Sequence, residues 1–282
     1  MKAATAIGIA AGVFALLLAS MMEGTQPMAF FNISALMIVL GGTGAATLSS
    51  VGLDAMKRVP SLYKMAFGPP ELDVRGRVDL LVSIAEQARR EGLLALDAQL
   101  GEIEDEYTRK GLQLVVDGTD PELVREILEA ELDGMAARHA AGATAFEKAG
   151  GYAPTMGIIG TVMGLVHVLQ NLSAPSTLGP AISTAFIATL LGVGSANVIF
   201  LPVASRLRAL SAAELELRAL TLDGILAVQA GDNPRVVGDK LSSFVAPAER
   251  GADAAAPGGA ARGEAVDTAP PAATGEPAAE AA

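Results

Sequence analysis

One long stretch without charged residues most constrains how this chain can fold. Residues 149–205 read AGGYAPTMGIIGTVMGLVHVLQNLSAPSTLGPAISTAFIATLLGVGSANVIFLPVAS and contain no Asp, Glu, Lys or Arg. The segment SAPSTLGP in the middle is rich in Ser, Pro and Gly, which predicts a turn. Each apolar arm beside it has roughly 20 residues or more, enough helix to cross a bilayer. The stretch therefore predicts a transmembrane helical hairpin.

Small residues recur along one side of each arm at spacings of four, three and four: Ala153, Gly157, Gly160 and Gly164, then Ala185, Thr189, Gly192 and Ala196. This spacing places each set on one helix face, where small side chains let another backbone approach closely. We therefore assign a helix-packing role to Gly157, Gly160, Gly164 and Gly192. The face either packs the hairpin tightly or receives a further helix, and its repetition on both arms favours the second reading.

Two threonines and two prolines mark the same hairpin. Thr161 and Thr189 each lie about midway along an arm, where a hydroxyl in lipid needs a partner or a water molecule. Either hydroxyl can also bond back to a carbonyl one turn away. Pro154 and Pro202 lie near the arm ends that adjoin the charged segments. Pro202 falls late in its helix, where it removes a backbone hydrogen bond and predicts a kink.

Two further apolar segments, residues 3–22 and 28–51, flank the short turn EGTQP, and Glu23 is the only charged residue between Ala3 and Gly52. The first segment is long for the apolar part of a signal peptide, and a second span follows at once. We therefore reject a signal peptide. The predicted fold class is all-α: a polytopic membrane protein with four transmembrane helices in two hairpins and a helical cytoplasmic domain.

Basic residues near the ends of the spans predict the orientation. They follow the second span, precede the third and follow the fourth: Lys57, Arg58, Lys64, Lys148, Arg206 and Arg208. The two short turns between spans carry no Lys or Arg. Because Lys and Arg stay on the cytoplasmic side, both termini and the large middle segment are expected in the cytoplasm. The net charge of −11 does not oppose this orientation, since the rule counts nearby basic residues.

The predicted domains are a first hairpin (1–52), a cytoplasmic helical loop domain (53–148), a second hairpin (149–205), cytoplasmic C-terminal helices (206–245) and a disordered tail (246–282). In the loop domain, Gly92 is expected to end an amphipathic helix. Asp120 and Pro121 provide a start signal for a helix that continues into the membrane. The tail is rich in Ala, Pro, Gly and Glu, with almost no large apolar residues, a composition typical of disorder.

No catalytic motif is present: the sequence contains no GxSxG, phosphate loop or HExxH, and no Cys for a thiolate site. The two histidines, His139 and His167, are far apart, and no basic stripe indicates nucleic-acid binding. We therefore expect neither an enzyme nor a metal or cofactor site. Ion transfer through lipid normally needs an ionisable group in the membrane, and His167 is the only one in these spans. An ion-conducting role therefore requires a partner helix that supplies a carboxylate, and the small-residue faces are where it is expected to dock.

Two segments together carry a resemblance to a known family: FEKAGGYAPTMGIIGTVMGLVHVL and LGPAISTAFIATLLGVGSANVIFLPVASRL. They resemble the MotA/PomA family, the A subunits of bacterial flagellar stators. The likeness includes the four-helix layout, DPELVREILEAELD and NPRVVGDKL, and it extends to about Val245. GIIGTVMGL alone also occurs in the wider group of ExbB and TolQ, which have three membrane helices and a different loop arrangement.

The resemblance implies an ion channel of the bacterial plasma membrane, built as a ring of A subunits, a homopentamer, around a B-subunit pair. The MotB/PomB-like partner would bring a membrane Asp and a peptidoglycan anchor. Flow of H⁺ or Na⁺ would turn the ring, and the loops of the A subunits would push on the flagellar rotor switch protein.

The resemblance also implies roles for single residues. Pro154 and Pro202 match two functional prolines that couple ion flow to conformation. Thr189 matches a threonine near the ion path, and Thr161 falls where sodium-driven members carry Thr and some proton-driven members carry Ala. In the loop, Arg89 matches an arginine that contacts the rotor, with Arg90 as an additional candidate, and Asp97 replaces the usual Glu.

Several alternatives stay open at this point. An ExbB/TolQ-like subunit would energise an outer-membrane process instead of rotation, and a non-conducting scaffold would need no hydroxyl in mid-membrane. For Arg89 and Asp97, a solvated helix face of little energetic value is the competing explanation. The residues leave proton and sodium coupling equally open.

Overall fold

The computed structural model describes residues 4–173 and 175–245. The chain divides into two compact units, Met1–Phe244 and Val245–Ala282, and the architecture below belongs to the first unit. The predicted disordered tail, residues 246–282, lies outside the described residues. Every regular element in the described part is helical, and four helices are long and apolar enough to cross a membrane: Ala4–Met22, Ile33–Phe67, Pro121–Gln170 and Pro175–Ala230. This agrees with the predicted fold class.

The first hairpin differs from the expectation in where its second helix begins. Helix α1 (Ala4–Met22) is followed by the turn and a short 3₁₀ helix, η1 (Pro27–Phe30). The second span then begins with α2 (Ile33–Leu36) and continues through a π-helical segment, η2 (Met37–Gly41), into α3 (Gly42–Phe67). Asn32 fixes this start, because its side chain accepts a hydrogen bond from the Ala35 N–H and donates one to Thr184 Oγ1 at 2.8 Å. The apolar run alone placed the start five residues too early.

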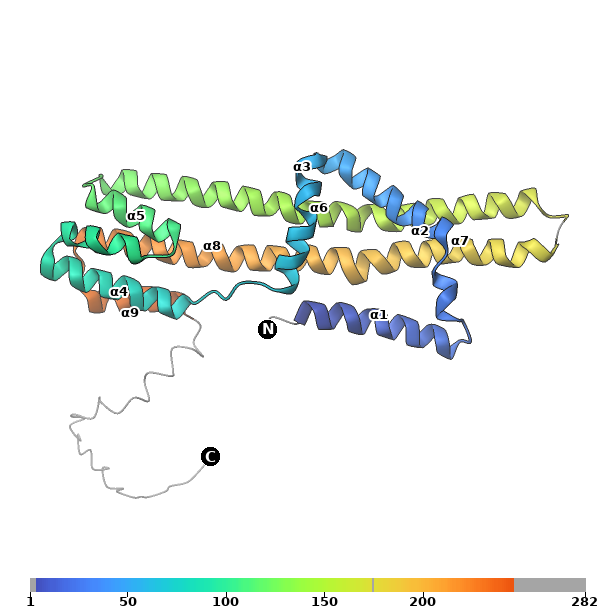
Figure 1. Cartoon of the computed structure of the whole chain (residues 1–282), viewed down its shortest axis with the longest axis horizontal. Helices are drawn as coiled ribbons and strands as arrows, with labels where there is room; N and C mark the ends of the chain where they lie inside the picture. The colour runs from blue at the N-terminus through green and yellow to red at the C-terminus, as the bar shows by residue number, and fades with distance from the viewer. Residues whose placement is uncertain (1–3, 174, 246–282) are drawn as a thin grey trace, which may run out of the picture. The chain divides into compact units, whose positions relative to one another are not determined.

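Gly52 divides α3 into two parts that point in different directions. Its backbone has φ 80° and ψ 169°, a conformation that suits glycine and breaks the helical path. The second part, residues 53–67, is here named the crossing segment, because it runs across α6 and α8 (Figure 1). Leu62 and Tyr63 of this segment pack against a buried cluster that includes Phe146, and the Tyr63 and Phe146 rings meet edge to face at 4.9 Å.

Two long helices connect the membrane region to the helical domain. Helix α6 (Pro121–Gln170) has 50 residues, and α7 (Pro175–Ser195) continues through the π-helical segment η4 (Ala196–Phe200) into α8 (Leu201–Ala230). The predicted turn at residues 173–180 was too long, because α7 already begins at Pro175 and contains Pro180. Pro175 is the first residue of α7, where its missing N–H has no partner to lose, whereas Pro180 lies inside the helix.

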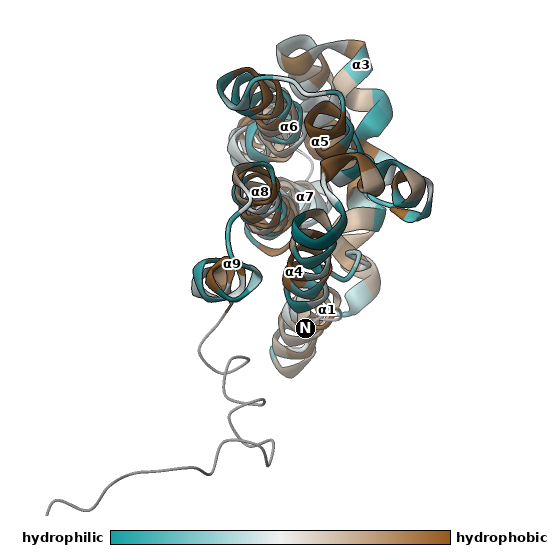
Figure 2. Cartoon of the chain, turned by 90° about the vertical axis from the view of Figure 1, so that its left-hand side faces the viewer, coloured by the Kyte–Doolittle hydropathy of each residue, from teal (hydrophilic) through white to brown (hydrophobic). Residues whose placement is uncertain are grey.

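The helical domain consists of α4 (Val74–Glu91), the 3₁₀ segment η3 (Leu93–Glu102), α5 (Glu106–Val116), α9 (Pro234–Leu241), the short 3₁₀ turn η5 (Ser242–Phe244) and the adjoining ends of α6 and α8. Gly92, with φ 88°, ends α4 as the sequence predicted, and Asp120 caps α6 through a hydrogen bond from the Glu122 N–H. Figure 2 shows hydrophilic and hydrophobic residues on different sides of these helices. The core includes the fully buried Leu81, Leu128, Leu220 and Ile225.

Candidate ion-path site

The two helices of the second hairpin approach each other through the predicted small residues. A Cβ atom on Gly157 would lie 2.9 Å from the Ala188 carbonyl oxygen, and one on Gly192 would collide with the Ala153 carbonyl oxygen and lie 3.0 Å from Gly157 Cα. Contacts at these distances involve backbone that cannot move aside. Glycine is therefore required at Gly157 and Gly192 for this crossing of α6 and α7.

Gly160 and Gly164 extend the same contact toward the connecting turn. A Cβ on Gly164 would lie 2.6 Å from Ala185 Cβ, and one on Gly160 would lie 2.7 Å from Ala188 Cβ. At these four glycines the small-residue face packs within the chain, so the first of the two readings, a tightly packed hairpin, describes this contact.

Thr161 and Thr189 meet at the centre of this crossing. Their hydroxyl groups are hydrogen-bonded to each other. Thr161 Oγ1 also lies 3.1 Å from the Gly157 carbonyl oxygen and 3.0 Å from that of Ala185, so back-bonding within the helix coexists with a bond across it. Each hydroxyl has one hydrogen and two acceptor lone pairs, so the pair keeps acceptor capacity beyond these bonds. Both side chains are only half-buried.

The two prolines lie beside a common contact between α6 and α8. Pro154 cannot donate the usual hydrogen bond to the carbonyl of Gly150, one turn earlier. A Cβ on Gly150 would lie 2.6 Å from Leu201 Cδ2, and Leu201 immediately precedes Pro202. Pro202 itself lies in the first turn of α8, directly after the π-helical segment η4. The sequence predicted a kink at Pro202, and the structure has a π-helical turn immediately before this residue.

The three loop residues lie on solvent-facing positions of the helical domain. Arg89 and Arg90 are in the last turn of α4, and Asp97 is in η3, just after the Gly92 break. All three are exposed. Arg90 forms a loose ion pair with Glu86, with Nη2 and Oε2 3.8 Å apart, and its side chain is 78% exposed.

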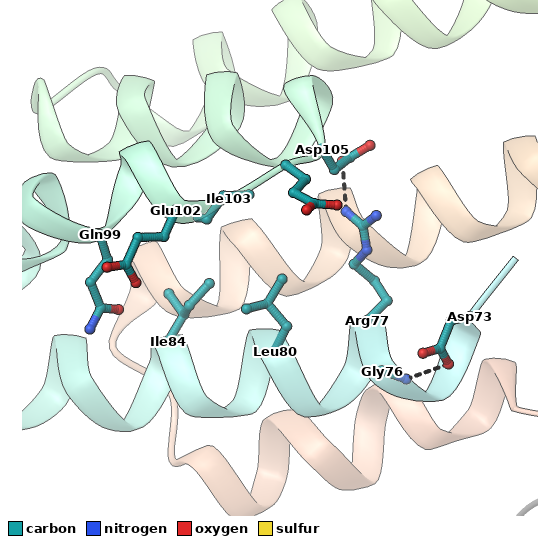
Figure 3. Close-up of a pocket in the computed structure, with 10 residues that line it drawn as sticks. Asp73, Gly76, Arg77, Leu80, Ile84, Gln99, Glu102, Ile103 and Asp105 are labelled. Carbon is teal, nitrogen blue, oxygen red and sulfur yellow. Dashed lines mark hydrogen bonds and ion pairs between the residues drawn. The ribbon is translucent and has the colours of Figure 1, made fainter.

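An ion pair that the sequence analysis missed stabilises the start of α5. Arg77 Nη1 of α4 donates to Asp105 Oδ2 at 2.6 Å (Figure 3). Asp105 also accepts a hydrogen bond of 2.8 Å from the Thr108 N–H. Burial alone would raise the pKa of Asp105, but the hydrogen bonds from Arg77 and Thr108 outweigh burial and hold this pKa below its ordinary value. The spacing of Asp105 and Thr108 is a helix-start signal, although nothing in the sequence identifies Arg77 as the partner.

This ion pair borders a surface pocket of about 680 Å³ between α4 and η3, where Leu80 and Ile84 face Gln99 and Glu102 (Figure 3). In the described residues, no group of three or more His, Cys, Asp or Glu side chains is arranged to hold a metal ion. The polar groups of the membrane hairpin are hydroxyls, amides, carbonyls and the exposed imidazole of His167. The arrangement can offer oxygen ligands or a hydrogen-bonded path, but no carboxylate.

Comparisons with known proteins agree with this architecture. Residues 99–219 match the model of the MotA/TolQ/ExbB proton channel family. The chain is 36% identical over 245 residues to motility protein A of Bacillus subtilis, covering 86% of this chain and 91% of the relative. It is 33% identical over 245 residues to the chemotaxis protein PomA of Vibrio alginolyticus, covering 87% and 96%. The solved flagellar MotAB stator complex from Bacillus subtilis superposes with a TM-score of 0.81 at 36% identity, covering 86% and 96%.

The four candidate membrane helices define a multi-pass membrane protein, and the match over residues 99–219 relates it to a proton channel family. Within that class, the chain belongs to the motility protein A family, which includes PomA, as matches over most of the relatives' length show.

Proposed function

We propose that this chain is the A subunit of a flagellar stator, which couples a flow of H⁺ or Na⁺ to torque on the flagellar rotor. The observation that carries the proposal is the hydrogen-bonded pair Thr161 and Thr189 at the centre of an uncharged, glycine-packed hairpin. The two hydroxyl groups are only half-buried and keep acceptor capacity, so an ion or a partner side chain could reach them in mid-membrane. The protein acts as a channel subunit rather than an enzyme, without a cofactor, in the bacterial inner membrane with both termini in the cytoplasm.

A B-subunit partner of the MotB/PomB type completes the site in this proposal. The hairpin offers hydroxyl and carbonyl oxygens, and a membrane Asp of the partner would supply the ionisable group. The partner's peptidoglycan anchor would hold it still while a ring of five A subunits turns around it. Since the small-residue face is filled within the chain, the partner helix would approach the half-exposed side of the threonine pair.

Force leaves the membrane through the continuous helices in this proposal. Pro154 and Pro202 lie where α6 and α8 touch, so a shift near the ion path would pass to the helical domain there. Arg89, Arg90 and Asp97 would then contact the rotor switch protein through their exposed charges. An ExbB/TolQ-like role is not favoured, because four candidate membrane helices and near full-length similarity to motility protein A support the stator.

The first test is ion flux in liposomes. We expect the full chain alone to leak no more H⁺ or Na⁺ than empty liposomes, because its membrane helices contain no carboxylate. The chain reconstituted with its B-subunit partner should conduct, and replacing the partner's membrane Asp with Asn should abolish the flux. Steady conduction by this chain alone would contradict the two-subunit mechanism.

The second test identifies the transported ion. Sodium needs several oxygen ligands to replace its water, whereas a proton needs only a carboxylate and a hydrogen-bonded path. Swimming speed is measured at fixed pH while sodium is replaced by potassium, in the wild type, Thr161→Ala and Thr189→Ala. Ser20→Ala is the matched control, since its hydroxyl bonds only to Leu17 of the same helix among the described contacts. A wild type that slows as sodium is withdrawn indicates sodium coupling, and one that ignores sodium indicates proton coupling.

A further inference from the structure

The crossing segment has the composition of a helix that lies along a membrane surface. It follows the membrane part of α3 directly after the sharp turn at Gly52, on the side of the helical domain (Figure 1). Its basic residues are Lys57, Arg58 and Lys64. It also exposes large apolar side chains, with Leu53 65%, Met65 42% and Phe67 37% exposed. Basic residues beside exposed apolar ones are typical of helices that bind at a lipid interface.

A cavity of about 420 Å³ lies where this segment meets α6 and α8. The crossing segment contributes Arg58, Leu62 and Met65, α6 contributes Arg138 and His139, and α8 contributes Leu210, Ser211 and Glu214. Part of the wall is therefore cationic and part is apolar. The segment packs closely at this point, since a Cβ on Gly142 would lie 3.2 Å from Leu62 Cδ1.

The carboxylates that line the cavity are each paired with a cation other than Arg58 and Arg138. Asp54 pairs with Lys57 at 3.5 Å, and Glu214 pairs with Arg218 at 3.1 Å. Within residues 4–173 and 175–245, neither Arg58 nor Arg138 forms an ion pair. The cavity thus presents two guanidinium groups without a counterion.

His139 adds a third nitrogen-bearing group to the same wall. Its Nδ1 lies 3.1 Å from Ser211 Oγ, which orients the ring and leaves Nε2 available for another partner. A guanidinium group presents several N–H donors in a planar fork that matches a phosphate group. Two such groups facing one cavity are the donor set that a phosphate monoanion requires.

We propose that this cavity binds the headgroup phosphate of an acidic phospholipid. Arg58 and Arg138 hold the phosphate from two sides, and Leu62 and Met65 form the apolar wall along which the glycerol backbone and the first acyl carbons lie. The bilayer is the source because the cavity opens beside a segment that follows a membrane span and exposes apolar side chains. The bound lipid fixes the crossing segment, and with it the base of the helical domain, to the membrane surface.

The test measures lipid retained by the purified full chain. Protein in detergent is equilibrated with equal amounts of phosphatidylglycerol and phosphatidylcholine of identical acyl chains, and bound lipid is counted by native mass spectrometry. The test variant is Arg58→Gln with Arg138→Gln. The control is Arg125→Gln with Arg235→Gln, which removes the same charge from exposed positions away from the cavity.

We expect wild type and control to prefer phosphatidylglycerol, and the test variant to lose this preference about tenfold or more, since each basic residue near an anionic headgroup is worth roughly a factor of five. An unchanged preference in the test variant would overturn the proposal, as would an equal loss in the control. Glycerol 3-phosphate and inorganic phosphate are added as competitors. Displacement of the lipid by either at equal concentration would mean that the site takes a free anion, and the lipid assignment would fall.

Discussion

The two halves of helix α6 pack by opposite means. In the membrane half, Gly157 brings the α6 backbone against that of α7, and Gly192 does the same from the other side. In the half that belongs to the helical domain, Val124 and Leu128 are completely buried among other large aliphatic side chains. Even a glycine of the helical domain packs in this way. A Cβ on Gly111 of α5 would contact the side chains of Ile225 and Leu128, whereas a Cβ on Gly157 or Gly192 would contact backbone.

Solvent explains this contrast. In water, burial of large apolar side chains provides the main driving force for packing. In lipid, an exposed leucine is already in an apolar environment, so close backbone contact through small residues becomes the available source of stability. The two halves of this helix are therefore stabilised in different ways. Loss of side-chain volume should destabilise the half in the helical domain, and added volume should destabilise the half in the membrane.

Removing volume should be most damaging in the helical domain. We expect Leu128→Ala to lower the free energy of unfolding by about 2–5 kcal/mol, because it leaves a cavity in a fully buried site. Leu123→Ala is the matched control on the same helix, where the side chain is 47% exposed and little should change. Thermal unfolding of the detergent-solubilised chain measures both. If the two variants were equally stable, burial of large side chains would not be what stabilises this half of α6.

Adding volume should be damaging in the membrane half. Gly192→Ala places a methyl group against the Ala153 carbonyl, and we expect a loss of about 1–3 kcal/mol. Gly8→Ala is the control, since no heavy atom lies within 4 Å of a Cβ at that position in α1. The same unfolding measurement applies, with Gly8→Ala expected to be neutral or slightly stabilising. If Gly192→Ala were harmless, backbone contact would not be what holds α6 and α7 together.

The ion pair between Arg77 and Asp105 should make the stability of the helical domain sensitive to acid. The folded-state pKa of Asp105 is lowered, so its contribution is fully present above the unfolded-state pKa of about 4 and is lost as pH falls through the lower folded-state pKa. We expect Asp105→Asn to cost about 1–2 kcal/mol at pH 7 and progressively less below pH 4. Unfolding at several pH values checks this. If the difference in unfolding free energy between wild type and variant stayed constant with pH, protonation of Asp105 would not be linked to stability.

Exposed charges in the helical domain should affect torque without affecting stability. For Arg89→Glu combined with Asp97→Lys, we expect a change in unfolding free energy within about 0.5 kcal/mol, together with reduced torque in motile cells. The defect should vary with ionic strength, since exposed charges are screened over roughly 10 Å. Tethered-cell rotation at low and high salt measures it. Normal rotation under both conditions would show that the rotor is contacted elsewhere.

Much of the fold was predictable because it follows from local composition. Uncharged runs of sufficient length identified all four membrane helices, and Gly92, Asp120 and Pro121 marked helix boundaries where the structure has them. The spacing of Gly157 and Gly192 predicted a close helix contact. The spacing did not reveal which helix makes this contact, because a row of small residues can pack against the next helix of the same chain or against a helix of another subunit.

What the sequence did not reveal depends on long-range contacts. The start of the second span at Ile33 is set by the hydrogen bond between Asn32 and Thr184, 152 residues apart. The path of the crossing segment depends on Gly52 and on packing against α6 and α8. The sequence placed Thr161 and Thr189 midway along their helices, but the hydrogen bond between them depends on how α6 and α7 pack. Such features arise from assembly of the helices, which no single segment encodes.

The unbroken course of α6 has a mechanical consequence. From Thr161 to Pro121 the helix advances by 40 residue steps, or about 60 Å at the rise of an α-helix. Treated as a stiff rod, it acts as a lever whose long arm lies outside the membrane. Each degree of tilt about the threonine pair would move the distant end by about 1 Å. Motions near the threonine pair that are too small to disturb the glycine contacts would thus become displacements of several ångströms at the far end of α6.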